Sequence, residues 1–162
     1  MKVIFLDIDG VITSVRTSWY NFDIHALHFL RWICNTADVK IVISSTWRYQ
    51  YTKAFWTTIF QDTLHDDFRT PHIVSTDRRG GEINAWLKKH KEVKRYLILD
   101  DDSDMLKSQI KSFRKTRSMD GLMSDDMMWI RDYFKCDGYP HETKDIYIHP
   151  NMFDATRDRT LK

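Results

Sequence analysis

Residues 2–11 read KVIFLDIDGV, and the predicted fold is built outward from this stretch. Its run of apolar, partly β-branched residues predicts a strand that is buried on both faces. The run ends in Asp7 and Asp9, and Gly10 follows directly. Because side chains alternate along a strand, both carboxylates are expected on the same side, and the glycine permits a sharp turn after them.

Two carboxylates held this close together repel one another, so the pair needs a compensating group. That group can be a divalent cation, a proton or a nearby basic side chain. A hard cation such as Mg²⁺ prefers oxygen ligands, and it is the interpretation we favour for Asp7 and Asp9. The alternative is an Asp-x-Asp sequence in an ordinary surface turn, because such short motifs also occur without function.

The pattern of a buried strand with polar residues at its carboxyl end occurs twice more. The places are residues 39–43 (VKIVI), followed by Ser44 and Ser45, and residues 95–99 (RYLIL), followed by Asp100 and Asp101. Between the first two strands, apolar residues at helical spacing predict a helix over 24–35 with Asp23 as its N-cap. Strand, helix, strand is the unit of a parallel sheet, so we expect an α/β fold of three layers with a Rossmann-like, mostly parallel central sheet.

The other segments carry weaker patterns. Residues 11–20 lack a clear period and predict a loop over the carboxylates, and residues 62–71 predict a polar connection. The remaining expected elements are a helix over 49–60, a short strand over 72–74, a turn over 76–81, helices over 82–90 and 105–110, an edge strand over 113–116 and a helix over 125–134 capped by Ser124. Residues 136–162 predict an ordered strap with a frayed end.

Length and composition narrow the class of protein. A chain of 162 residues, 42% hydrophobic and 30% charged, is typical of one globular domain over 1–162. The net charge of +2 is too small to indicate nucleic-acid binding by itself. Cys34 and Cys136 lack the spacing of a metal or redox motif and are interpreted as reduced thiols. The start of the chain does not resemble a signal peptide and no apolar run reaches membrane-spanning length, so we expect a cytoplasmic protein without a membrane partner.

In an open parallel sheet, ligands bind outside the carboxyl ends of the strands. The carboxylates of Asp7 and Asp100, the hydroxyl of Ser44 and a basic residue ahead of the helix at 82–90 would converge on this rim. This combination suits a phosphate held beside Mg²⁺. One carboxylate could attack phosphorus, the hydroxyl and backbone N–H groups could hold the phosphoryl oxygens, and the cation could neutralise the transferring group.

Four motifs in this order resemble those of the haloacid dehalogenase-like (HAD) phosphohydrolase superfamily. They are DIDGV at 7–11, Ser44 after KIVI at 40–43, Arg79 ahead of a helix, and Asp100 with Asp101 after YLIL at 96–99. Three longer stretches are similar to the HAD domains of Swiss Army Knife RNA-repair proteins, namely 43–48 (ISSTWR), 79–83 (RGGEI) and 99–105 (LDDDSDM). The resemblance extends over residues 1–122.

The resemblance implies a role for each matching residue. Asp7 would be the nucleophile that forms an aspartyl-phosphate, and Asp9 would protonate the leaving oxygen and then activate water. The other implied residues are Ser44, which would hold a phosphoryl oxygen, Arg79, which would steady the nucleophile and the phosphate, and the Mg²⁺ ligands Asp7, Asp101 and the Asp9 carbonyl, supported by Asp100.

The identity of the basic residue stays open between four candidates. Arg78, Lys88 and Lys89 compete with Arg79 for this role. Arg79 is favoured because it precedes the helix, where its side chain can reach the rim.

The spacing of the motifs bears on the substrate. Only about 35 residues separate the first motif from the second and the second from the third, which leaves minimal or no room for a cap domain. An uncapped site can admit a nucleotide, a nucleic-acid end or a phosphoprotein. The residues expected to contact the substrate are Gly10, Ser45, Trp47 and Arg48, with the aromatic residues Trp19, Tyr20, Tyr49 and Tyr51 in loops near the rim. Aromatic faces and an arginine could stack on a base, although the same rings can instead pack in the core.

The expected function is a Mg²⁺-dependent phosphatase that hydrolyses phosphomonoesters, with a phosphorylated small molecule such as a nucleotide, or a nucleic-acid end, as substrate. The alternative is a catalytically weak HAD-fold module that binds a nucleotide or nucleic acid. A receiver-type signalling domain also has acidic residues after its first strand, but its phosphoacceptor would end a middle strand, where this chain has Ser44. Basic residues over 107–117 either face a phosphate or form a solvated surface. The sequence does not determine the oligomeric state.

Overall fold

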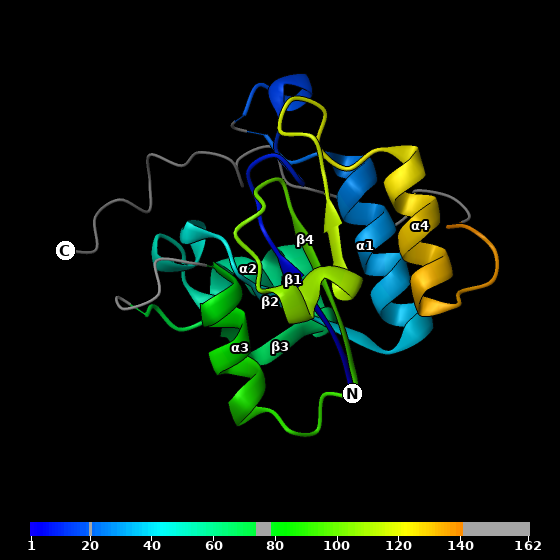
Figure 1. The fold of residues 1–162 in the computed structure, drawn as a ribbon. Helices are drawn as coiled ribbons and strands as arrows, with labels where there is room; N and C mark the ends of the chain where they lie inside the picture. Colours follow the sequence, from blue (N-terminus) through cyan, green and yellow to red (C-terminus); the bar gives the residue numbers. More distant parts are fainter. Residues whose placement is uncertain (20, 74–78, 141–162) are drawn as a thin grey trace.

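The structure of the chain is a computed structural model that describes residues 1–19, 21–73 and 79–140 (Figure 1). Its centre is a five-stranded sheet in the order β3-β2-β1-β4-β5. The strands are β1 (Lys2–Leu6), β2 (Val39–Ile43), β3 (Leu64–Arg69), β4 (Arg95–Asp100) and β5 (Phe113–Lys115). Each neighbouring pair is parallel, which confirms the expected α/β fold with a parallel sheet.

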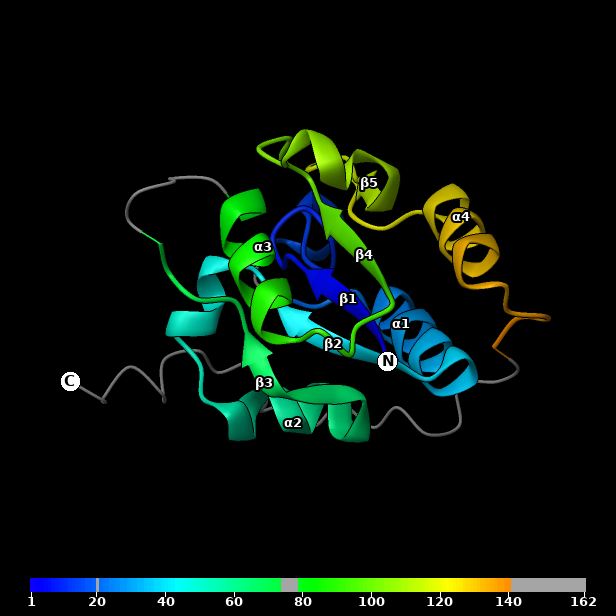
Figure 2. The ribbon, with the colours of Figure 1, turned by 60° about the horizontal axis from the view of Figure 1, so that its bottom comes forward.

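The helices form a layer on each face of this sheet. Side chains of α1 (Ile24–Ala37), α2 (Lys53–Phe60) and α4 (Ser124–Phe134) join one buried cluster, and those of α3 (Arg79–Lys89) join another. The ribbon of α3 lies on one side of the sheet and those of α1 and α4 lie on the other (Figure 2). Among the described residues, four short 3₁₀ helices lie in the connections, namely η1 (Val15–Thr17), η2 (Thr46–Tyr49), η3 (Gln61–Thr63) and η4 (Lys107–Ser112). The three layers therefore arise from strands that are apolar on both sides.

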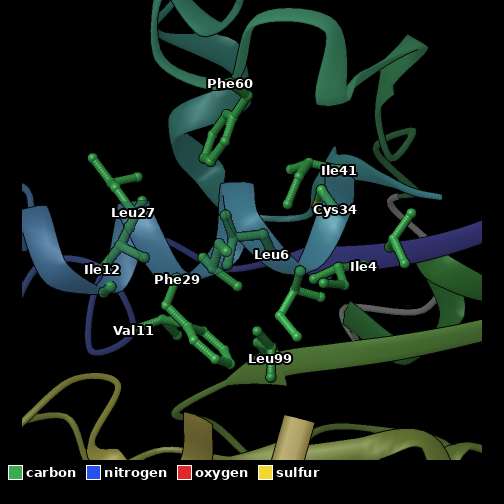
Figure 3. Close-up of a cluster of buried hydrophobic side chains, with 14 of the residues drawn as sticks. Ile4, Leu6, Val11, Ile12, Leu27, Phe29, Cys34, Ile41, Phe60 and Leu99 are labelled. Atoms are coloured by element: carbon green, nitrogen blue, oxygen red, sulfur yellow. The ribbon is translucent and has the colours of Figure 1, made fainter. Parts of the chain in front are cut away.

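Alternation along β1 divides its side chains between the two clusters. Ile4 and Leu6 pack in the larger cluster with α1, and Figure 3 shows them together with Ile41 and Leu99 of the neighbouring strands. Val3 and Phe5, which alternate with them, pack instead in the cluster on the α3 side. Phe5 there contacts Trp86 of α3 edge to face. Asp7 continues this alternation and therefore emerges on the α3 side of the sheet.

The connection expected at 62–71 is wrong, because this segment contains β3. The prediction of a strand over 72–74 is wrong for His72 and Ile73, which follow the end of β3 and belong to no strand. Val74 lies outside the described residues. The reason is that β3 is an edge strand with few apolar residues, and its pairing to β2 shifts register between Ile41 and Ile43. Backbone pairing holds such a strand without a strong hydrophobic pattern.

Several boundaries also differ from the sequence expectation. The helix expected over 49–60 begins only at Lys53, where the Thr52 side chain accepts from the Phe55 backbone N–H. The helix expected from 82 begins at Arg79, within the expected turn. By contrast, α1 has the expected N-cap, since Asp23 accepts hydrogen bonds from the backbone N–H groups of His25 and Ala26.

The expected C-terminal strap falls mostly on 141–162, outside the described residues. Within the part of the chain that the structure describes, no helix has the length and apolar character needed to cross a membrane. The gap between β1 and β2 holds only η1 and α1 in its described part, in keeping with the expected minimal cap.

Candidate active site

The central strands end at one level and bring the expected polar residues to a common rim. The Asp7 backbone N–H donates to Leu99 O at 2.9 Å, and the Ser44 N–H donates to Leu6 O at 2.9 Å. These bonds continue the in-register pairing of β1 with β4 and β2 just past the last strand residues. The rim lies at the end of the sheet opposite the N label in Figure 1.

Three carboxylates gather at this rim. Ligand oxygens of Asp7, Asp100 and Asp101 lie within 4.8 Å of one another, and Asp7 and Asp100 are buried. Gly10 makes the close approach possible, because its φ is +68° and a Cβ at this position would lie 2.4 Å from Asp101 Oδ2. The group offers only oxygen atoms, the donor type that Mg²⁺ takes, so the residues present fit such a cation.

Arg79 is the basic residue that reaches the carboxylates. Its Nη1 donates to Asp7 Oδ1 at 2.7 Å and its Nε lies 2.9 Å from Asp100 Oδ2. Lys88 and Lys89 are exposed at the other end of α3, and Arg78 lies outside the described residues. Among the described candidates, Arg79 therefore has the placement expected of the basic residue that contacts the carboxylates.

The start of α3 is fixed against the loop after β4, and this fixes Arg79. The Arg79 backbone N–H donates to Asp104 Oδ2 at 2.7 Å, so a residue far along the chain satisfies a helix N-terminal donor. Gly80 allows this contact, because a Cβ would lie 2.6 Å from the backbone nitrogen of Leu106. The Gly80 carbonyl in turn accepts from Gln109 Nε2 at 2.9 Å.

Burial controls the charge of the cluster. It raises the pKa of Asp7 even though Arg79 opposes the rise, and it raises the pKa of Asp100 to about 8, with the charge of Asp7 as the next cause. Burial disfavours the charge of Arg79 as well, but Asp7 and Asp100 outweigh this effect and raise its pKa. One guanidinium thus pairs with two of the three carboxylates, and a bound cation would relieve the remaining repulsion.

Asp9 occupies a separate position beside this cluster. Its Oδ1 accepts from Thr13 Oγ1 at 3.0 Å and its Oδ2 from Trp47 Nε1 at 2.8 Å. Its carboxylate is not a member of the close group of three. The two aspartates of the first motif therefore have different surroundings.

The two serines after β2 are both buried, and they differ in their contacts. The Ser45 side chain hydrogen-bonds to Asp7 and favours the ionised carboxylate. The hydroxyl of Ser44 is fully buried without a hydrogen-bond partner among the described residues. Buried hydroxyl groups usually have a partner, so Ser44 retains a free capacity to bind an oxygen atom at the rim.

Arg48 does not have the expected position of a substrate contact. It is 2% exposed, and its Nη1 donates to Ser44 O at 2.6 Å and to Ser45 O at 2.8 Å. Its Nε donates to Thr70 O, and its Nη2 forms an ion pair with Glu82 at 2.6 Å. The guanidinium is thus used in joining the ends of β2 and β3 to α3, and no surface is left for a substrate.

The aromatic residues near the rim divide between packing and exposure. Trp47 is half-buried and stacks on Tyr51 with a centroid distance of 5.4 Å. Tyr49 is 50% exposed and Trp19 is 37% exposed, whereas Tyr20 lies outside the described residues. Trp47 and Tyr51 therefore pack against each other, whereas Tyr49 and Trp19 are exposed.

A second group of possible metal ligands is explained by its own contacts. Ligand atoms of His65, His90 and Glu92 lie within 4.8 Å of one another. Both ring nitrogens of His90 already face carboxylates at 3.0 Å, those of Glu92 and Asp67, and the ring stacks on Trp86. We therefore interpret this group as a hydrogen-bonded link between β3 and the end of α3. The histidines of α1, His25 and His28, belong to neither group.

The basic residues over 107–117 are largely engaged with acidic partners or polar groups. Arg114 pairs with Asp125 and Asp126, and Lys115 Nζ donates to Ser103 Oγ at 2.7 Å. This pairing favours the solvated-surface interpretation over a phosphate-facing stripe.

Sequence reasoning missed two contributors to the site. Thr13 follows Asp9 by four residues within a segment predicted only as a loop, and its hydrogen bond to the carboxylate depends on the turn after β1. Trp47 was expected at the substrate, whereas its indole N–H binds Asp9. The motif order signals that both segments meet at the rim, but it does not signal these contacts.

The parallel sheet and the acidic residues at its strand ends are the arrangement of a HAD-type domain. The model of the family described as "HAD domain in Swiss Army Knife RNA repair proteins" matches residues 3–127. The chain belongs to this family, which confirms the resemblance found in its motifs. Comparisons with curated proteins and with solved structures give no match.

Proposed function

We propose that the protein is a Mg²⁺-dependent phosphomonoesterase that acts through Asp7. The observation that carries this proposal is the contact of Arg79 with two buried carboxylates, Asp7 and Asp100, beside Asp101 at the strand ends. A buried nucleophile held by a cation, with oxygen ligands for a metal next to it, suits attack on a phosphate group.

The reaction would begin with Asp7 as the nucleophile. Arg79 binds Asp7 Oδ1, so the other carboxylate oxygen would form the bond to phosphorus while the bond from phosphorus to the leaving oxygen breaks. Asp9 would donate a proton to that leaving oxygen. It would then take a proton from the water that attacks the aspartyl-phosphate, which releases phosphate and restores Asp7.

The remaining residues would hold the transferring group. The free hydroxyl capacity of Ser44 and the guanidinium of Arg79 would bind phosphoryl oxygens, and Ser45 would orient Asp7. Asp7, Asp101 and the Asp9 carbonyl would hold Mg²⁺, with Asp100 in support. Bound there, the cation supplies positive charge next to the transferring phosphoryl group.

We further propose a nucleotide or a phosphorylated nucleic-acid end as the substrate. The family description refers to RNA repair proteins, and the described chain inserts no folded unit over the rim. The half-exposed Tyr49 beside the buried Arg48 offers an aromatic surface near the carboxyl ends of β2 and β3. A catalytically weak binding module is the alternative function, since the same surface could bind without turnover.

Phosphate release in the presence of Mg²⁺ tests the enzyme. The substrates are nucleoside 3'- and 5'-monophosphates, oligonucleotides with 3'- or 5'-phosphates, a sugar phosphate and an aryl phosphate. We expect release that stops with EDTA and with Asp7→Asn. Asp66→Asn is the matched control, because Asp66 is a fully exposed aspartate on β3, and this variant should keep wild-type activity.

Two outcomes would contradict the proposal in different ways. Release that survives in Asp7→Asn would exclude Asp7 as the nucleophile. If the folded protein released phosphate from none of the substrates but bound an oligonucleotide in calorimetry, the enzyme proposal would be wrong and the binding-module alternative would be supported.

A further inference from the structure

The carboxylate of Asp9 is held from two sides by groups of different hydrogen-bonding capacity. Thr13, in the turn after β1, donates to Oδ1 at 3.0 Å, and Trp47, after β2, donates to Oδ2 at 2.8 Å. A hydroxyl can donate or accept, whereas an indole N–H can only donate. The two oxygens of Asp9 are therefore not equivalent.

We propose that Trp47 is a positioning residue for Asp9 and that its indole N–H fixes the orientation of the carboxyl group. This inference rests on the proposed function, in which Asp9 is the acid for the leaving oxygen.

The indole is itself held in place by packing. Its ring lies against Phe22 at a centroid distance of 5.9 Å and stacks on Tyr51 at 5.4 Å, and Tyr51 stacks on Phe55 of α2 at 4.3 Å. The next residue, Arg48, is pinned to the backbone of Ser44 and Ser45. A ring fixed in this way presents its N–H in one direction, so it can preorganise the carboxyl group before substrate binds.

Positioning of an acid affects substrates unequally, because the need for a proton depends on the leaving group. The sugar oxygen of a nucleoside phosphate is a poor leaving group without a proton, whereas the oxygen of p-nitrophenyl phosphate leaves readily as an anion. Loss of the Trp47 hydrogen bond should therefore slow the first substrate far more than the second. A residue that only supports the fold would change both rates by the same factor.

The test compares Trp47→Phe with the wild type on a nucleoside 3'-monophosphate and on p-nitrophenyl phosphate, each with Mg²⁺. We expect kcat/KM for the nucleotide to fall about 10- to 100-fold and kcat/KM for the aryl phosphate to change less than about 3-fold. The comparison uses kcat/KM because this constant reports formation of the aspartyl-phosphate, the step in which the leaving oxygen needs a proton, and not the later hydrolysis that both substrates share. Asp9→Asn should show the same selectivity with a larger loss. Trp32→Phe is the matched control, because Trp32 is also half-buried and packs against Phe29 on α1, and it should change neither rate.

The outcomes separate this inference from the proposed function. An equal loss on both substrates, or no loss on either, would overturn the positioning role of Trp47. Absence of Mg²⁺-dependent release by the wild type, with Asp7→Asn indistinguishable from it, would overturn the proposed function instead.

A second measurement does not depend on the folding of Trp47→Phe. In protein labelled with ¹⁵N at its six tryptophans, an indole N–H signal should move when Asp9 is changed to Ala, because the carboxylate acceptor is removed. Indole signals that all keep their positions would overturn the hydrogen bond on which the inference depends.

Discussion

Arg79 illustrates how one side chain organises the candidate site at the scale of a residue. Its guanidinium reaches Asp7 through Nη1 and Asp100 through Nε, so one planar group connects the ends of β1 and β4. A lysine would supply the same charge at a single point without this two-sided geometry. The position of the nucleophile therefore depends on the shape of Arg79 as well as on its charge.

Replacement of Arg79 should lower the rate of phosphate release. We expect Arg79→Ala to reduce kcat by about 10²- to 10³-fold, because a preorganised donor at the transferring group is lost, and Arg79→Lys to fall between this variant and the wild type. Lys88→Ala is the control, since Lys88 is an exposed residue of the same helix. If Lys88→Ala lost as much activity as Arg79→Ala, the assignment of the catalytic cation to Arg79 would be wrong.

At the scale of elements, the rim depends on contacts between segments that are distant in sequence. Arg48 joins the ends of β2 and β3 to α3, and Asp104 holds the first residue of α3 against the loop after β4. These contacts align the helix that carries Arg79 with the strands that carry the carboxylates. The geometry of the site is therefore a property of the packed elements.

Removal of the Arg48 side chain should destabilise the protein without a direct effect on substrate binding. We expect Arg48→Ala to lower the free energy of unfolding by about 3–5 kcal/mol, because it leaves Glu82 and three backbone carbonyls without their buried partner. Urea unfolding measures the loss, and KM of the remaining folded protein should stay unchanged. A raised KM with unchanged stability would instead support the substrate contact expected from sequence.

At the scale of the whole molecule, the charge of the rim couples stability to pH and to metal. Burial raises the pKa of Asp100 to about 8 in the metal-free protein, compared with about 3.9 in an unfolded chain. The contribution of this group to stability is fully present below the unfolded pKa and is lost as the pH rises through the folded pKa. A bound cation favours the charged carboxylate and should reverse this loss.

Mg²⁺ should therefore raise the melting temperature more at pH 8 than at pH 5. At about 100 times its dissociation constant, the cation should stabilise the protein by roughly 2.7 kcal/mol at pH 8, which corresponds to roughly 5–10 °C. Thermal melts with Mg²⁺ and with EDTA at both pH values provide the measurement. Asp100→Asn should reduce the pH dependence in EDTA, and an equal increase at both pH values would contradict the assignment.

The central strands β1, β2 and β4, their parallel direction and the polar residues at their ends could be read from the sequence. A strand buried on both faces leaves a continuous apolar run, and the residue after that run must emerge at the carboxyl end of the sheet, as Asp7 and Asp100 do. These are local patterns, and local patterns depend only on neighbours in the chain. The family and the candidate site residues follow from the same patterns.

The contacts of the site were decided only by the tertiary structure. The burial of Arg48, the edge strand β3 with its few apolar residues, and the hydrogen bond from Trp47 to Asp9 all involve segments that are far apart in the sequence or held mainly by backbone pairing. A residue type does not specify which distant partner its side chain meets, because packing of the whole chain selects that partner. The sequence by itself therefore determined which chemical groups reach the rim, and the tertiary structure decided how each of them is held there.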